Sequence, residues 1–546
     1  MSVTGPGRPV RWVLWALVVV LPVAFLAVFF AYPVGAILGR GLTQGSALDV
    51  VRRRSTGRLV WFTVWQAAAS TALTMIVGLP AAWALARVDL PGRRSLRALL
   101  MVPFVLPTLV VGAALEALFA TLGVDGTSPG LRLQDTVWAI LLAHMVLNVA
   151  VVIRIVGGYW ALLDPRAEEA ARTLGASRWR VGREVVAPGL APALWSAAGI
   201  VFLFCFTSFG VILTVGGIGH RTVETEIWRS ATQRTDLTTA AALALAQLLV
   251  VLALVLVVTQ LEGRASNVRA AGGLRPPRPI RSGRQRLVVS AAMLPALVLV
   301  VVPLSVLVGQ SLRVGSGYGL ANYRALAHAE TTGLFVSPVA AVRNSLTYAV
   351  AATALAVVVG GLASVVVVYG RRGAGRATDL ALMVPLGTSA VTLGFGMLIA
   401  LDSPPLDLRT SRWIVPIAQT LVAIPFVVRA TVPALRAIDP RQREAATVLG
   451  ADPWRVRLAV DARVLARALL VGAAFAFAIS LGEFGATAFL ARPDAPTVPV
   501  AMFRLLGRPG GALHGQAMAL GTVLAVLTGG CVLVIERLRP RDALGW

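Results

Sequence analysis

The chain has 546 residues, of which 57% are hydrophobic and 14% are charged, whereas roughly a quarter of the residues of a soluble domain are charged. This composition excludes an ordinary soluble domain and indicates a protein that lies in a lipid bilayer. The formal charge of +25 could suggest nucleic-acid binding. The arginines, however, fall between apolar runs, so we expect no nucleic-acid partner and interpret them as orienting the chain in the membrane.

The basic residues are all arginine, and lysine is absent. A phosphate-binding P-loop needs a lysine after its glycine-rich turn, so this chain cannot build one and any ATP hydrolysis must take place on a partner. Cys205 and Cys531 lie inside apolar runs, and the four histidines are dispersed. We therefore expect no catalytic constellation, no metal site and no cofactor, and we predict that the chain is not an enzyme.

The apolar runs predict an all-α polytopic membrane protein with about twelve transmembrane helices. Each run approaches or exceeds the roughly 20 residues that cross a bilayer core, and none alternates in polarity as a barrel strand does. In chain order the expected spans are residues 12–38, 60–86, 96–122, 136–160, 190–217, 240–260, 287–312, 344–370, 378–402, 413–432, 466–490 and 514–536.

The arginines between these spans predict their orientation. They concentrate in the loops between spans two and three, four and five, and six and seven, and in the C-terminal tail. These segments share one side if both termini are cytoplasmic, so we expect a multi-pass protein of the inner (cytoplasmic) membrane. The group Arg52–Arg54 with Arg58 is an exception on the expected outer side.

The two halves of the chain repeat. Residues 164–194 and 439–469 are identical at eighteen of thirty-one positions with an offset of 275, and further upstream an offset of 282 aligns Gly78 with Gly360. Six spans per half give both halves the same orientation, so the repeats are parallel and are related by an axis along the membrane normal. Residues 263–286, rich in Gly, Pro and Arg, predict a cytoplasmic linker between transmembrane domains of residues 1–262 and 287–546.

The repeated polar loop contains signals for two short helices. Asp164 can cap a first helix that begins at Pro165, Gly175 suits a left-handed C-terminal cap, and Ser177 can cap a second helix. The second copy repeats these features in Asp439-Pro440, Gly450 and Asp452-Pro453. We therefore expect two compact helix-turn-helix units on the cytoplasmic face, related by the pseudo-two-fold axis and suited to a dimeric partner.

This loop resembles the EAA motif of binding-protein-dependent (type I) ABC importer permeases. The matching residues are Glu169, Ala170, Ala171, Gly175 and Pro188 in the first copy and Glu444, Ala445, Ala446 and Gly450 in the second. The second copy departs from the motif at Arg463, which stands where the first has Pro188. This departure concerns the fine geometry of its second helix and leaves the assignment of the motif unchanged.

The resemblance implies that both loops seat in two ABC ATPase subunits at the cytoplasmic face. ATP-driven closure of those subunits would open the permease outward to a substrate-binding protein, and the helices would alternate access without covalent chemistry. The fused layout resembles thiamine and ferric-iron permeases, which implies a small solute. A twelve-span secondary transporter of the major facilitator type is the alternative, but it predicts midplane coupling carboxylates and no duplicated loop.

Two polar residues near the end of the fifth and eleventh spans are candidates for the transport pathway. Glu483 and its repeat counterpart Ser208 differ in charge, so a site there would be asymmetric. An interhelical hydrogen bond is the alternative role for Glu483. The neighbouring pairs Phe209-Gly210 and Phe484-Gly485 are either close-packing glycines or points at which the spans bend.

Overall fold

The computed structural model describes residues 8–43, 47–126, 132–217, 219–268, 278–328, 335–370, 388–404 and 406–538, together with a few isolated residues between 373 and 385. Helices make up most of these residues, and the strands form two pairs of two-residue segments. The predicted all-α polytopic class is confirmed. Long apolar segments form helices because, in lipid, a helix satisfies every backbone hydrogen bond within the segment.

The first half runs from α1 to α13. Its helices are α1 (Arg8–Leu26), η1 (Ala27–Ala31), α2 (Tyr32–Thr43), α3 (Ala47–Arg52), α4 (Arg54–Arg87), α5 (Arg93–Val105), α6 (Thr108–Leu122), α7 (Val137–Leu162), α8 (Pro165–Thr173), α9 (Arg178–Val181), η2 (Gly182–Val186), α10 (Ala187–Phe206), α11 (Gly210–Val215), α12 (Val223–Thr232) and α13 (Leu237–Val268). The segments η1 and η2 are single π-helical turns within longer helices.

The second half follows the same order. Its helices are α14 (Gly283–Leu312), α15 (Ala321–Ala325), α16 (Pro338–Tyr369), α18 (Ala390–Ala400), α19 (Ile414–Arg436), α20 (Pro440–Val448), α21 (Pro453–Val456), η4 (Arg457–Asp461), α22 (Ala462–Gly482), α23 (Thr487–Leu490), α24 (Val498–Leu506) and α25 (Gly511–Leu538). The strands are β1 (Val88–Asp89), β2 (Arg278–Pro279), β3 (Arg313–Val314) and β4 (Gly317–Tyr318), and β1 pairs with β2 in parallel.

Ten helices among the described residues are long and apolar enough to cross a membrane, and the bent pair α5–α6 raises this number to eleven. The expected count of twelve is therefore approximate. The third expected span is not straight, because α5 and α6 meet at 103° around Leu106 and Pro107, and proline cannot continue the helical hydrogen-bond ladder. Much of the ninth expected span lies outside the described residues, and its described helix α18 has 11 residues.

The first helix of each half packs against the opposite half. Leu26 and Phe30 of α1 and η1 share an apolar core with Tyr348 and other residues of α16. Conversely, Met293 and Val300 of α14 belong to the core formed by α4–α7 of the first half. The two halves are therefore interlocked, and their tight packing takes place across the repeat as well as within it.

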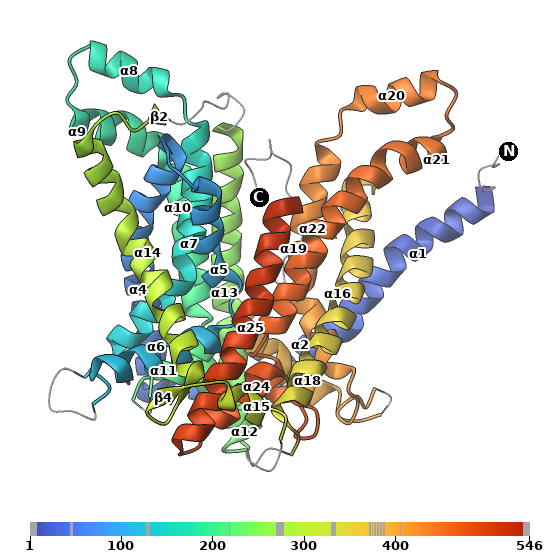
Figure 1. Ribbon diagram of the computed structural model, residues 1–546. Coiled ribbons are helices and arrows are strands. Elements are labelled where there is room, and N and C mark those ends of the chain that lie inside the picture. The colour runs from blue at the N-terminus through green and yellow to red at the C-terminus, as the bar shows by residue number, and fades with distance from the viewer. Residues whose placement is uncertain are drawn as a thin grey trace.

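The repeated loops lie at one end of the molecule. Figure 1 shows α8 and α9 well separated from α20 and α21 at the same end, with the start of α1 and the end of α25 also there. The short helices α12, α15, α18 and α24 gather at the opposite end (Figure 1). Because Arg87 at the end of α4 contacts α8, the exposed Arg52–Arg54 and Arg58 at the start of this 34-residue helix belong to the end opposite the loops.

Helices extend into both edges of the expected linker of residues 263–286. Helix α13 continues to Val268, and α14 begins at Gly283. Between them, β2 pairs with β1, which directly follows α4. The linker is thus attached to the first half close to the repeated loop.

Candidate functional site

The first repeated loop folds as its sequence predicts. The Asp164 carboxylate accepts a hydrogen bond of 2.9 Å from the Arg166 backbone N–H and caps α8, with Pro165 in the first helical position. The helix ends where Gly175 adopts φ of +84°. The N–H groups of Gly175 and Ala176 donate to the carbonyls of α8, so the carbonyls at the helix end are satisfied by a left-handed turn.

The second helix of this loop differs from the compact unit expected. Ser177 caps it, with its hydroxyl oxygen 3.3 Å from the Arg180 N–H. Gly182 then keeps helical geometry, with φ of −58°, so nothing ends the helix and it continues as a single segment from Arg178 to Phe206. The turn after α8 is therefore attached directly to a transmembrane helix.

The second loop repeats this geometry. Asp439 caps α20 at 2.9 Å from the Arg441 N–H, and Gly450 has φ of +82°. Asp452 caps the following helix by accepting from the Trp454 N–H at 2.8 Å. The π-helical turn η4 lies 275 residues after η2, so both copies have this turn although Arg463 stands in place of Pro188. Pro188 lies just after the π-helical turn η2, and the corresponding turn η4 forms without a proline after it.

The motif residues form accessible surfaces on both loops. In each copy the glutamate, the first alanine and the glycine are exposed and the second alanine is half-buried; Pro188 is also exposed. Leu174 and Leu449, which precede the two glycines, are each 87% exposed. Sequence reasoning did not single out this leucine pair, although its identity in both copies was a usable signal. Trp179 is 79% exposed, whereas its counterpart Trp454 is half-buried.

Each loop is held to its own half by a charged contact, but the chemistry differs. The Arg87 guanidinium lies 2.6 Å from the Glu168 carboxylate, which joins α4 to α8. In the second half Arg443 of α20 lies 2.9 Å from both the Asp461 carboxylate and the Tyr369 hydroxyl. The repeat offsets of 275 and 282 equate Glu168 with Arg443 and Arg87 with Tyr369. The two loops therefore share an attachment point and have different electrostatics.

The predicted pathway residues lie at breaks in the fifth and eleventh spans. Ser208 and Glu483 are each 6% exposed. The Glu483 carboxylate accepts the N–H groups of Ala486 at 2.7 Å and Thr487 at 3.0 Å, so it caps α23. The Ser208 hydroxyl has no hydrogen-bond partner among the described residues. No hydrogen bond in the described part of the chain joins the two.

The glycines beside these residues lie at helix breaks and pack closely against neighbouring helices. The long helices end at Phe206 and Gly482, so the chain breaks at both Phe-Gly pairs. An added Cβ at Gly210 would lie 2.2 Å from the Thr108 hydroxyl oxygen, and one at Gly485 would lie 2.9 Å from the Ala390 Cβ. Both glycines are required for close packing at the break.

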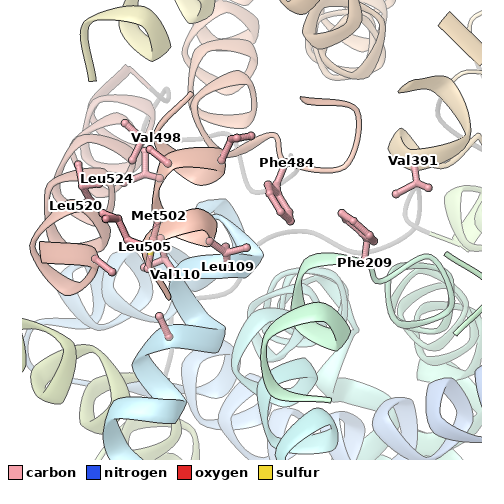
Figure 2. Packing of buried hydrophobic residues seen from close by; sticks show 14 of the residues in the cluster. Leu109, Val110, Phe209, Val391, Phe484, Val498, Met502, Leu505, Leu520 and Leu524 are labelled. Carbon is pink, nitrogen blue, oxygen red and sulfur yellow. The ribbon is translucent and has the colours of Figure 1, made fainter. Parts of the chain in front are cut away.

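Four aromatic rings join the two halves between these breaks. Phe209 and Phe484 stack with ring centroids 5.4 Å apart and an interplanar angle of 23°, and Figure 2 shows the two rings facing each other. Trp228 lies 6.0 Å from Phe209, and Phe503 lies 5.6 Å from Phe484 and 6.0 Å from Trp228. The offset of 275 relates both pairs, so this aromatic cluster surrounds the pseudo-two-fold axis.

Comparisons with known proteins agree with this architecture. Residues 74–267 match the family described as binding-protein-dependent transport system inner membrane component. The thiamine transport system permease protein of Salmonella typhimurium is 27% identical over 95% of this chain and 94% of its own length. That of Escherichia coli is 26% identical over 89% of both chains. The sulfate transport system permease protein of Escherichia coli is 37% identical over 26% of this chain and 52% of its own length.

The end-to-end similarity and the repeated loop have the same explanation. The family match covers the first loop, and relatives of the same length extend across both halves. These relatives are named as permease proteins of transport systems. The first half therefore contains a domain of the binding-protein-dependent transport family, and the end-to-end similarity supports a permease of an ABC importer with two fused transmembrane domains.

Proposed function

We propose that this permease carries thiamine, or a closely similar organic cation, from a substrate-binding protein to the cytoplasm by alternating access. The observation that supports this substrate is the set of relatives that match along nearly the whole chain and are named as thiamine permeases. Similarity over both halves includes the walls of any central pathway, so it bears on the solute as well as on the fold.

The two loops are proposed to dock two ABC ATPase subunits. Leu174 and Leu449 present matched apolar tips, and Glu169 and Glu444 lie on the exposed surface of α8 and α20. Exposed leucines at identical repeat positions suit a buried contact with a two-fold partner. The residues proposed for coupling are Glu169, Ala170, Ala171, Gly175, Pro188, Glu444, Ala445, Ala446 and Gly450.

Movement of the loops would reach the pathway through continuous helices. Each loop passes into one segment, Arg178–Phe206 or Trp454–Gly482, that ends beside the aromatic cluster. A rigid helix transmits displacement of its loop end to its far end. Closure of the ATPase subunits would therefore separate Phe209 from Phe484. The fifth span, in the domain of residues 1–262, and the eleventh span, in the domain of residues 287–546, would move in the same way.

This mechanism assigns the two ends of the molecule to the two sides of the membrane. The loops and both termini would face the cytoplasm, and the end that carries α12 and α24 would receive the binding protein. The arginines around β1, α8 and α9 are consistent with a cytoplasmic location.

Uptake into proteoliposomes tests the proposal. The permease would be reconstituted with its cognate ATPase and binding protein, and labelled thiamine and ferric iron would be offered in parallel. We expect ATP-dependent thiamine accumulation and no iron accumulation, with an ATPase unable to hydrolyse ATP as the control. Uptake driven by an ion gradient without the ATPase would contradict the mechanism, and iron uptake without thiamine uptake would contradict the substrate.

A further inference from the structure

Glu224 is a fully buried carboxylate that joins the two halves of the permease. Its side chain is 0% exposed. One oxygen accepts the Ser389 hydroxyl of the second half at 2.9 Å, and the other accepts the Gln247 amide of the first half. Among the described residues Glu224 makes no ion pair. The carboxylate is thus held only by neutral donors.

A charge in this position has no evident structural purpose. Burying a carboxylate without a cation is costly. A neutral amide of the same shape could accept from the Gln247 amide and donate to the Ser389 hydroxyl oxygen. The repeat counterpart of Glu224 is Pro499, so the repeated fold does not require an acid at this position. Ionisable groups inside a membrane protein commonly mark the path of a substrate or ion.

Both carboxylates are adjacent to the aromatic cluster. Glu224 and Trp228 lie one turn apart on α12 and so share a helix face, and Glu483 directly precedes Phe484. The Trp228 indole N–H and the Ser208 hydroxyl, next to Phe209, have no hydrogen-bond partner among the described residues. Aromatic faces beside a carboxylate attract organic cations, and the effect grows when water is excluded.

We propose that Glu224, Glu483 and the aromatic cluster form a transient site for an aromatic organic cation. In this structure the rings stack on one another and close the junction between the halves. When the halves separate, the solute ring would replace the Phe209–Phe484 contact and its positive charge would lie toward Glu224. This inference rests on the proposed function and adds to it the residues that select a cation.

Equilibrium binding to the complete transporter tests the site. The permease would be assembled with its ATPase subunits, trapped with ATP and vanadate, and titrated with labelled thiamine without binding protein. Glu224→Gln keeps the shape and removes the charge, whereas the matched control Ser389→Ala removes one hydrogen bond and keeps the charge. We expect Glu224→Gln to weaken thiamine binding about tenfold or more and Ser389→Ala to weaken it about threefold or less.

Binding of an uncharged ligand distinguishes loss of charge recognition from misfolding of the Glu224→Gln variant. Thiochrome, an uncharged fused-ring derivative of thiamine, should bind the wild type weakly and should bind Glu224→Gln no more weakly than the wild type. Equal thiamine affinity in wild type and Glu224→Gln, or equal losses for thiamine and thiochrome, would overturn the inference while the proposed function stands. Absence of thiamine uptake by the wild-type transporter would overturn the proposed function and this inference together.

Discussion

Arg87, at the end of α4, and Glu168, in the first turn of α8, form an ion pair with a separation of 2.6 Å, and both side chains are largely shielded from solvent. This contact joins α8 to the loop end of α4, so we expect it to make the loop follow the transmembrane helices more rigidly. Its counterpart in the second half is the contact of Arg443 with Tyr369 and Asp461.

Arg87→Ala should loosen α8. Loss of one member of a partly shielded pair costs about 1–2 kcal/mol, so amide exchange over residues 165–176 should accelerate about tenfold. Hydrogen-exchange mass spectrometry measures this change, with residues 440–451 as the internal control. The charge-reversed double variant Arg87→Glu with Glu168→Arg should restore protection, and a failure to do so would show that the ion pair is not what holds α8.

Gly175→Val should uncouple ATP hydrolysis from transport. Gly175 has φ of +84° and an added Cβ would meet nothing within 4 Å, so the penalty of about 1–2 kcal/mol is backbone strain alone. Gly182→Ala is the matched control, because Gly182 has open space and φ of −58°. The ratio of thiamine transported to ATP hydrolysed should fall severalfold in Gly175→Val and stay unchanged in the control.

Leu174→Asp and Leu449→Asp should each weaken ATPase binding. Both leucines are 87% exposed, so the substitutions leave the permease fold intact while placing a charge in an apolar contact worth about 1–3 kcal/mol. Co-purification of the ATPase at increasing salt measures the effect, and Leu320→Asp, at an exposed position distant from the loops, is the control. Wild-type ATPase retention in both variants would rule out docking at these tips.

Phe484→Ala should destabilise the closed junction. Removing a buried ring from a packed cluster costs about 3–5 kcal/mol, and the lost contacts are those to Phe209 and Phe503. Basal ATPase activity without binding protein should rise severalfold, because less energy is needed to separate the halves. Phe335→Ala, at a ring that is 81% exposed, should leave basal activity unchanged; equal activity in both variants would contradict a closing role.

The proposed orientation can be measured by thiol labelling. Arg58→Cys should react with a membrane-impermeant maleimide in intact spheroplasts, and Leu174→Cys should react after permeabilisation. The native Cys205 is buried and Cys531 is half-buried, so the background is low and a Cys-free version provides the baseline. Labelling of Leu174→Cys in intact cells would reverse the assignment of the two ends.

The repeated loop was the part of the site most accessible from sequence, because its signals are local. Asp164, Gly175 and Asp452 act through hydrogen bonds and dihedral angles within a few residues of themselves. The site at the junction was only partly accessible. Ser208 and Glu483 were recognisable as polar residues in apolar runs, whereas Glu224 follows a short polar segment and has no sequence feature that sets it apart.

Hydrophobic length, duplication and capping are properties of contiguous residues, so the membrane class, the parallel repeat and the two capped loops could be predicted without a structure. Only the folded chain shows which half each first helix packs against, how sharply α5 and α6 bend, and that Phe209 contacts Phe484. Folding also places Glu224 within hydrogen-bond distance of Ser389, which lies 165 residues further along the chain. Such contacts depend on how helices pack against one another. Apolar helices have similar compositions, so the sequence of one helix does not indicate which helices will contact it.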